Sequence, residues 1–398
     1  MAMQLATSSS AAIETAQAVG ETMADLLGQL GGPPDFLFVA SSAAYDLNEV
    51  IARTRRAGTS KLHGSTSCRG AMSDRGLRSE DGKGLAALGI RDAHGAYGSA
   101  LAVFEGDAFS AGRSAVDEAL RFADRPGEVP SLILMNASPG QEERVIEGIQ
   151  SVVGPLVPIL GGSAADNDVA GEWRLWTAGG VTGEGVAVSV LFPSVEISFA
   201  FRSGYVAEQV QGVVTRASGR CLAEIDGEPA ARVYDRWIDG DLAEFFGRGG
   251  NILGLTALQP LGRPVTTSEG LTYHSLAHPD AITPEDGLLL FAEIEEGETV
   301  VAMRSTVDGL IASGGQVVER ALRRARFSHE EASGALITYC GGCMLALGDR
   351  AGEVSSRIQE VVPGLPFIGM FTFGEQGKFA GGENMHSNLM ISAIVFGR

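Results

Sequence analysis

The stretch SLILMNASPGQEERVIEGIQSVVGPLVPILGGS, residues 131–163, contains one complete unit of the predicted fold. Apolar residues fill SLILMNAS at its start and LVPILGG at its end, and Gly or Pro bounds each run, which is typical of short buried strands. Between them, Gln141 to Val152 has apolar residues at helical spacing. A helix that joins two buried strands favours parallel pairing of those strands with a right-handed crossover.

The same order of elements recurs in the C-terminal half. Strand GALITYC, a helix over Glu353 to Val361, strand LPFIGMF and the run SNLMISAIVF follow one another there. Leu132 and Leu336 are 204 residues apart, and so are Phe192 and Phe396. A shorter copy covers residues 35–70, where DFLFVASS, a helix and LHGSTSCRG occupy the same places. The chain is therefore expected to contain a diluted internal repeat.

The predicted class is α/β, with mixed, mainly parallel sheets built from repeated strand–helix–strand units in two related halves. The runs 173–202 and 271–304 have hairpin-like spacing, which is why mixed sheets are expected. Residues 1–30 are predicted to form an amphipathic helix, since their apolar residues recur at helical spacing up to a Gly-Gly-Pro-Pro break. The remaining chain is divided into domains 31–220 and 221–398.

Charge and composition exclude several kinds of partner. The 398 residues include 30 Lys and Arg against 49 Asp and Glu, a net charge of −19 that repels nucleic-acid phosphates and anionic lipids. Four cysteines are too few for a disulfide scaffold, and no signal-peptide pattern begins the chain. The longest uncharged run, 334–348, is too short to span a membrane. A soluble cytoplasmic protein with no nucleic-acid or membrane partner is therefore expected.

A small-residue turn follows the second strand of each copy. The three turns are His63-Gly64-Ser65-Thr66, Gly161-Gly162-Ser163-Ala164 and Thr372-Phe373-Gly374-Glu375. Ligands of open α/β sheets bind beyond the carboxyl ends of the strands, so these turns are expected to form a binding site. The alternative is that their glycines serve only tight turns and helix packing.

Cys340-Gly-Gly-Cys343 is the sharpest local motif. It follows a predicted strand and precedes a helical stretch, so the first thiol is expected near a helix N-terminus, where the helix dipole would lower its pKa. Thiol redox chemistry at this pair is one hypothesis, and two buried structural cysteines are the alternative. No nucleophile elbow, Walker A loop or HExxH motif occurs. No metal site is predicted.

Several strings together resemble the FIST (F-box and intracellular signal transduction) family. KLHGSTSCRGAMSDRG and VPILGGSAADN, the latter followed by a Trp-containing strand, are similar to the FIST N domain. CLAEIDGEPAARVYDRWI, LITYCGGC, LPFIGMFTFGEQGKF and NMHSNLMISAIVF resemble the FIST C domain in the family's order. The resemblance covers about residues 31–398. Cys343 departs from the family's common Arg, which removes a cation that an anionic ligand could use.

The resemblance implies a sensory, ligand-binding module rather than an enzyme. The family is thought to bind small ligands such as amino acids, and some bacterial members bind haem and sense nitric oxide alongside a histidine kinase. The similar strings fill nearly the whole chain, so the protein is expected either to signal through a partner, such as a histidine kinase or another signalling protein, or to act as a stand-alone receptor. No cofactor is expected under the main hypothesis, and haem is the cofactor of the alternative.

Candidate ligand-binding residues are polar side chains and backbone amides at the strand-end turns. They are Gly64, Ser65, Thr66, Ser67, Gly162, Ser163, Asp166, Asn167, Cys340, Gly374, Glu375, Asn384, His386 and Asn388. The glycine amides would grip a carboxylate, and Glu375 would hold an amino group. The structural alternative is that Glu375 and Asn388 bond to buried turn amides. For haem, the candidate axial ligands are His63, Cys68 and His386.

Overall fold

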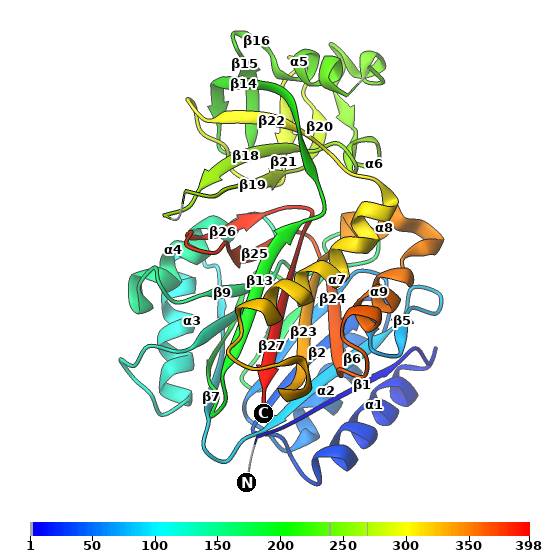
Figure 1. Ribbon diagram of the computed structural model, residues 1–398, viewed down its shortest axis with the longest axis vertical. Coiled ribbons are helices and arrows are strands. Elements are labelled where there is room, and N and C mark those ends of the chain that lie inside the picture. The colour runs from blue at the N-terminus through cyan, green and yellow to red at the C-terminus, as the bar shows by residue number, and fades with distance from the viewer. Residues whose placement is uncertain (1–2, 239, 269) are drawn as a thin grey trace.

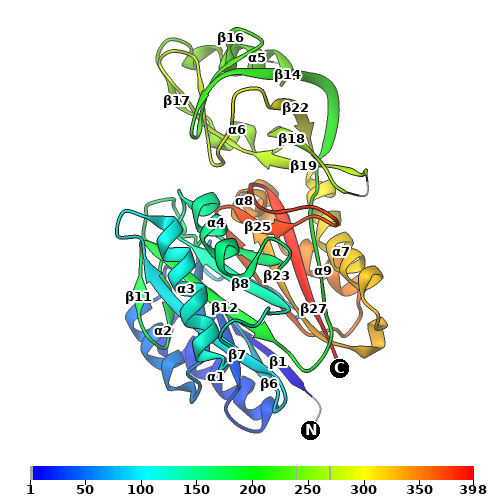
Figure 2. The same ribbon diagram turned by 90° about the vertical axis from the view of Figure 1, so that its left-hand side faces the viewer.

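Three units of one design build the larger body of the protein, and a smaller lobe is inserted in the third unit (Figure 1). The computed structural model describes residues 3–238, 240–268 and 270–398. Each unit runs strand, helix, strand, helical segment, strand, hairpin, strand. Figure 2 shows the smaller lobe standing above the body, to which two neighbouring strands connect it.

The bounds of the elements in the first two units are as follows. The first unit comprises β1 (Gln4–Ser10), α1 (Thr15–Leu30), β2 (Phe36–Ser42), α2 (Leu47–Thr54), β3 (Leu62–Ser67), β4 (Ala71–Ser73), β5 (Gly76–Arg78) and β6 (Leu85–Arg91). The second comprises β7 (Ala96–Val103), α3 (Ala108–Phe122), β8 (Leu132–Ala137), α4 (Glu142–Val153), β9 (Ile159–Gly162), β10 (Leu175–Thr177), β11 (Val181–Thr182) and β12 (Gly185–Phe192).

The third unit contains the inserted lobe between its first strand and its first helix. The unit comprises β13 (Ile197–Ser203), α7 (Val307–Arg324), β23 (Ala332–Cys340), α8 (Gly341–Leu347), α9 (Glu353–Val361), β24 (Phe367–Thr372), β25 (Glu375–Lys378), β26 (Asn384–Ser387) and β27 (Met390–Gly397). The lobe comprises β14 (Val206–Ser218), β15 (Cys221–Ile225), β16 (Glu228–Pro229), α5 (Ala230–Trp237), β17 (Gly250–Asn251), α6 (Leu253–Thr256), β18 (Leu261–Thr266), β19 (Thr272–Ala277), β20 (Pro279–Ile282), β21 (Leu288–Leu290) and β22 (Thr299–Arg304). Short 3₁₀ helices lie at Arg55–Ala57, Ala243–Phe245, His329–Glu331 and Gly348–Arg350.

The units exchange their hairpins in a closed ring. The three six-stranded sheets of the body have the orders β1-β6-β2-β3-β10-β11, β7-β12-β8-β9-β25-β26 and β13-β27-β23-β24-β4-β5. The hairpin of the first unit therefore completes the sheet of the third, that of the third completes the second, and that of the second completes the first. A separate nine-stranded sheet forms the lobe.

The mixed α/β class is confirmed, and its strand pairing differs in emphasis from the expectation. Parallel pairing is confined to β2–β3, β8–β9 and β23–β24 among the described residues, one pair in each unit. The other pairs are antiparallel, because the last strand of each unit returns beside the second and the exchanged hairpin adds two more. The repeat also has three full copies, since the short match at 35–70 belongs to a complete unit.

The N-terminal segment is a strand followed by a helix. The helix expected over 1–30 begins at Thr15, and β1 precedes it and pairs with β6. Residues 4–10, QLATSSS, carry almost no apolar signal because the strand is rich in small hydroxyl side chains. Within the described residues, no helix is long and apolar enough to cross a membrane.

The three sheets share one central core. Alternate side chains along each second strand point inward, such as Phe36 and Phe38 of β2, Leu134 of β8 and Leu336 of β23. The intervening side chains face outward to the helices of their own unit, as Leu37 does. This period-2 alternation gives each sheet two buried faces, so the strands of the body are apolar on both sides. The polar groups at the strand ends are held by this rigid frame.

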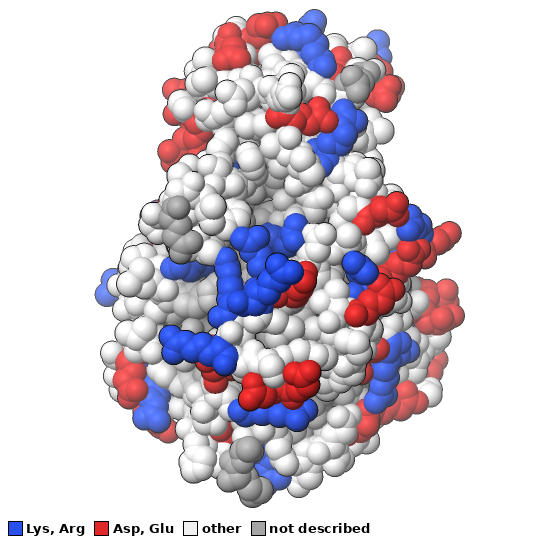
Figure 3. Space-filling view, viewed as in Figure 1, with Lys and Arg blue, Asp and Glu red and all other residues white. Residues whose placement is uncertain are grey.

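Charge is distributed unevenly over the surface. On the face shown in Figure 3, Lys and Arg gather in the middle, over α7 and β13, and Asp and Glu lie mainly toward the margins. Arg320 of α7 donates to the Tyr273 hydroxyl at 2.6 Å and lies over its ring. Tyr273 stacks on Phe379 with ring centroids 4.9 Å apart. The lobe is thus anchored to the body on this side through an arginine and two aromatic rings.

Candidate functional site

The three small-residue turns lie together, and backbone hydrogen bonds join each of them to the others. Ala165 N donates to the Thr66 carbonyl at 3.2 Å, Cys68 N to the Phe371 carbonyl at 3.0 Å, and Ser163 N to the Gly374 carbonyl at 2.8 Å. Each turn is therefore bonded to the other two at the point where the three units meet. Backbone donors used in this way are not free to hold a ligand.

The hydroxyl groups of these turns make hydrogen bonds inside the protein. Ser65 donates to the Thr66 carbonyl, Thr66 Oγ1 accepts from Arg174 N, Ser67 accepts from Phe371 N, and Ser163 donates to Glu142 at 2.6 Å. All four predicted residues are fully buried. Their observed contacts are those of the structural alternative, in which polar groups satisfy one another at a crowded junction.

Three further predicted residues fix loops around the junction. Asp166 accepts from the backbone amides of its own loop, the last at 2.7 Å from Glu172 N. Asn167 bridges Arg69 N and the Gly82 carbonyl at 2.7 and 3.1 Å. Asn384 accepts from Ile159 N at 2.9 Å. Asn167 and Asn384 thus connect units, and none of the three side chains lines the cavity described next.

A cavity of about 390 Å³ lies between the body and the lobe. From the body it is lined by Pro139, Val169, Trp173, Cys340, Gly342, Leu345, Ala346, Phe373, Gly374 and Asn388, and from the lobe by Asn251, Leu253, Gly254, Ala257, His278 and Phe291. Of the predicted residues, Cys340, Gly374 and Asn388 are brought together here. The volume is within the range of small-molecule pockets, which is about 300–1,000 Å³.

Aromatic pairs form two parts of the cavity wall. Trp173 and Phe373 of the body meet edge to face with centroids 6.3 Å apart. His278 and Phe291 of the lobe lie 6.0 Å apart. No Lys, Arg, Asp or Glu is among the residues that line the cavity. The wall is therefore mainly apolar, with a few polar groups.

Asn388 and His278 are polar groups of this wall, and a hydrogen bond joins them. The His278 backbone N–H donates to Asn388 Oδ1 at 3.1 Å, and Asn388 N donates to the Leu276 carbonyl at 2.9 Å. The His278 ring contacts the Thr256 hydroxyl at 2.9 Å. Burial lowers the pKa of His278 to about 4, so the imidazole is neutral at pH 7.

Cys340 lies where the sequence predicts, at the N-cap of a helix, but its thiol is not activated. Burial raises the pKa of Cys340 well above its usual range, and contact with Cys343 adds to the rise. The expectation of a lowered thiol pKa is therefore wrong, because desolvation outweighs the dipole of the short helix α8. Both cysteines are buried and free.

Glu375 is a completely buried carboxyl group. It accepts from Thr372 Oγ1 at 2.7 Å and from Met390 N at 2.8 Å. Burial raises its pKa well above the usual range, and the Cys340 thiol adds to the shift. The carboxyl faces the backbone of its own unit, so Glu375 satisfies turn groups and does not line the cavity.

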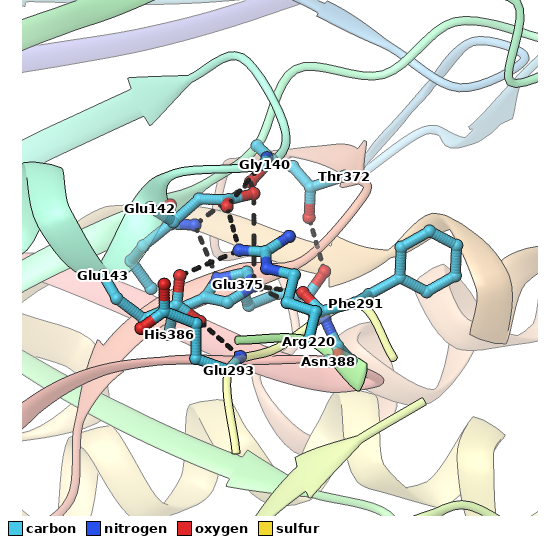
Figure 4. Close-up of polar contacts among 12 residues, drawn as sticks. Gly140, Glu142, Glu143, Arg220, Phe291, Glu293, Thr372, Glu375, His386 and Asn388 are labelled. Carbon is cyan, nitrogen blue, oxygen red and sulfur yellow. Dashed lines mark hydrogen bonds and ion pairs between the residues drawn. The ribbon is translucent and has the colours of Figure 1, made fainter. Parts of the chain in front are cut away.

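A polar network behind the cavity joins the lobe to the body (Figure 4). Arg220, in the turn between β14 and β15, bonds to Glu142 at 2.6 Å and to Glu143 at 2.8 Å. His386 lies between Gln376, 3.1 Å from Nδ1, and the Phe291 carbonyl, 3.1 Å from Nε2. Although burial opposes it, His386 and Arg220 lower the pKa of Glu143 to about 2. The network fixes the lobe against α4 through charged groups that water hardly reaches.

Two apolar residues in left-handed backbone conformation lie at the cavity. Val169, at φ 56°, lines it, and Leu389, at φ 55°, follows Asn388. The other non-glycine residues with positive φ in the described chain are Asp or Arg. A β-branched residue rarely adopts this conformation, and such strain gathers at functional sites.

The residues proposed as haem ligands do not fit that role as they are placed. His63 uses both ring nitrogens, toward Ser189 at 2.7 Å and Asn136 at 2.9 Å. Both nitrogens of His386 are engaged as well, and burial raises the pKa of Cys68 to about 12. None of the three lines the cavity. Within the described residues, no group of three or more His, Cys, Asp or Glu is arranged to hold a metal ion.

The fold and site define a two-lobed mixed α/β protein with a cavity between the lobes. Comparison with family models gives the FIST N domain over residues 35–228 and the FIST C domain over residues 230–378. The chain belongs to the FIST family, whose domains are associated with sensory modules of signal transduction. The F-box part of the expanded name given above is wrong. The boundary between the two matches falls inside the lobe, at β16.

Neither of two other comparisons indicates an activity. No curated protein matches the chain. A crystal structure of cyanuric acid hydrolase from A. caulinodans is similar over 100% of both chains, with 9% sequence identity and a TM-score of 0.42. A similarity this weak supports no inference about activity.

Sequence reasoning missed most of the cavity. Trp173, His278 and Phe291 are far apart in the chain and carry no motif, and the exchanged hairpin and the inserted lobe bring them together. The sequence did not predict the role of Arg220 either, although a lone Arg in a turn of an acidic protein is a modest signal of an ion pair. Of the three small-residue turns, the one at 372–375 reaches the cavity, through Phe373 and Gly374.

Proposed function

We propose that this protein is a sensory module that binds a small uncharged molecule in the cavity between its lobes. The observation that carries the proposal is that body and lobe line the cavity jointly. A molecule held there contacts both parts at once, so its binding energy depends on how the lobe sits on the body. That dependence is what a sensor needs in order to pass a signal to a partner protein.

The absence of charged lining groups favours an uncharged ligand. A carboxylate or ammonium group in this cavity would lose its hydration without gaining an ionic partner, which costs several kcal/mol. Free amino acids carry both charges, so they suit the cavity poorly. Burial of apolar ligand surface against the aromatic and aliphatic wall instead stabilises the complex, by about 25 cal/mol per Å².

Binding fits the chemistry of the wall better than catalysis does. The thiol of Cys340 has a raised pKa and the imidazole of His278 is neutral with its ring bonded to Thr256. Neither group is paired with an activating base, as a nucleophilic mechanism requires.

The test is thermal melting against a panel of uncharged molecules of up to about 15 non-hydrogen atoms. A ligand at 100 times its Kd should stabilise the protein by about 2.7 kcal/mol. Ala346→Phe, which fills the cavity from α8, should abolish the response. Ala16→Phe, on the exposed face of α1, is the matched control and should keep it.

Two results would overturn the proposal. One is a panel in which no molecule raises the melting temperature of the unmodified protein. The other is a set of ligands that stabilises Ala346→Phe as strongly as Ala16→Phe, since those molecules would bind elsewhere.

A further inference from the structure

We infer that the ligand is a planar aromatic molecule with one hydrogen-bond acceptor, and that Asn388 Nδ2 recognises that acceptor. The inference rests on the proposed function, because it names the class of molecule that the interlobe cavity takes. It is carried by the hydrogen bonds around Asn388 and by the rings of the wall.

The orientation of the Asn388 amide is fixed by its neighbours. The His278 backbone N–H needs an acceptor, so the atom 3.1 Å away must be Oδ1. Nδ2 is then the other end of the group. Nδ2 lies 3.5 Å from His386 Nε2.

His386 cannot accept that contact as a hydrogen bond. Its Nε2 lies 3.1 Å from the Phe291 carbonyl, which only accepts, so Nε2 must carry the proton. This holds whether or not Nδ1, which lies 3.1 Å from Gln376 Nε2, carries a proton as well. Two N–H groups therefore face each other between Asn388 and His386, and the Asn388 donor has no other hydrogen-bond partner among the described residues.

A buried donor without an acceptor is costly. The Asn388 side chain is almost completely buried, and the residue lines the cavity. Leaving such an N–H group unpaired costs free energy, which a carbonyl or ring-nitrogen acceptor on a ligand would recover. This requirement selects an acceptor and gives no benefit to a hydrocarbon.

The wall selects a flat ring. Trp173 and Phe373 contribute rings from the body, and His278 and Phe291 contribute rings from the lobe. Gly374 lines the cavity as well, and no side chain fits there, since a Cβ would lie 2.4 Å from the His386 ring. Aromatic pairs stabilise a complex beyond the effect of the area that they bury. The volume of about 390 Å³ limits the molecule to one or two rings.

The experiment uses matched small molecules on the full chain, with Trp fluorescence and thermal melting as readouts. Acetophenone should bind at least 10-fold more tightly than α-methylstyrene, in which a methylene group replaces the acceptor oxygen. It should also bind more tightly than cyclohexyl methyl ketone, which keeps the acceptor and loses the aromatic ring. Benzamide should bind and benzoate, its charged counterpart, should not.

Asn388→Leu keeps the branched shape of the side chain and removes Nδ2, together with the Oδ1 acceptor of the His278 N–H. This variant should lose the preference for acetophenone over α-methylstyrene and should still bind α-methylstyrene, which a purely structural Asn388 would not predict. If it does not fold, Asn388→Ala removes the same donor with less crowding.

The outcomes separate the two proposals. Equal binding of acetophenone and α-methylstyrene, equal binding of the aromatic and cyclohexyl ketones, or tight binding of benzoate would overturn this inference and leave the sensory function standing. Failure of every uncharged molecule, in this set and in the wider panel, would overturn both.

Discussion

Glu375 illustrates how burial decides the role of a single residue. Its sequence position, next to a glycine at a strand end, suits either ligand binding or a structural role. In the structure the carboxyl group is completely enclosed, and burial raises its pKa well above the usual range. Burial thus favours the uncharged form of the group, which accepts hydrogen bonds from Thr372 Oγ1 and Met390 N.

Replacing Glu375 by Gln should change how stability depends on pH. A carboxyl with a raised folded-state pKa binds its proton more tightly in the folded protein, so its contribution to stability is lost as pH rises above about 4.5. The amide has no proton to lose. Relative to the unmodified protein, Glu375→Gln should gain up to about 1.4 kcal/mol per pH unit in that range.

Urea denaturation at a series of pH values between 4.5 and 8 measures this difference. The exposed Glu105→Gln serves as the control and should show no such trend. A constant difference between Glu375→Gln and the unmodified protein across the range would contradict the prediction.

His63 has the opposite dependence on pH. Burial lowers its pKa to about 4, so the folded protein resists protonation and stability falls as pH drops from about 6.5 toward 4. His63→Gln should flatten this part of the pH profile by up to about 1.4 kcal/mol per unit, at some cost in stability at pH 7. The measurement is the free energy of unfolding at each pH, with the exposed His94→Gln as control. A profile as steep as that of the unmodified protein would refute it.

At the scale of elements, glycines lie where the exchanged hairpins pack against strands of another unit. Gly64 of β3 pairs with Trp176 of β10, and a Cβ at Gly64 would lie 1.9 Å from the Trp176 ring. Gly369 of β24 is in the same position, where Met72 of β4 would meet its Cβ at 2.5 Å. In both places a large side chain of one unit lies on a bare strand of another.

Gly64→Ala should therefore destabilise the protein by about 3 kcal/mol, because a buried indole and two paired strands leave no room to move. Gly20→Ala, in the middle of the exposed face of α1 with nothing within 4 Å of the new Cβ, should instead stabilise it by about 0.5–1 kcal/mol. Midpoints of urea unfolding compare the two variants. Similar midpoints for both would show that the space around Gly64 is not limiting.

The sequence reveals the elements of each unit better than their assembly. Buried strands such as 132–137 and 367–372 stand out because apolar runs between Gly and Pro need no partner to be recognised. The exchanged hairpins are short and rich in polar or aromatic residues. Their composition does not indicate which unit's sheet they join. Which strand they join depends on packing across three units, and the chain order alone does not contain that information.

At the scale of the whole molecule, the lobe is an addition to a complete body. Its two connections lie side by side, since Ser305 Oγ donates to the Gly204 carbonyl at 2.8 Å. Most of its buried apolar residues form a core of their own, while Leu276 and Met303 pack in the core of the third unit. The cavity residues from 251 to 291 could not be assigned to a site from sequence, because only the position of the lobe on the body brings them near Cys340 and Asn388.

Replacing residues 206–304 by a short Gly-Ser linker should leave a folded body that no longer binds the ligand. Loss of cover for Phe379, which stacks on Tyr273 of the lobe, should cost about 2 kcal/mol. Circular dichroism and thermal melting should show one cooperative transition at a lower temperature, with no shift on adding acetophenone. A soluble product without cooperative melting would contradict the independence of the body.

The exchange of hairpins also determines when each sheet can be completed during translation. Strands 4–10 through 85–91 leave the ribosome first, yet their sheet lacks its edge until residues 175–182 are made. The second sheet waits for residues 375–387. No sheet can close from its own unit, so the nascent chain carries open strand edges until most of it has been translated, when chaperones that shield such edges would be most needed.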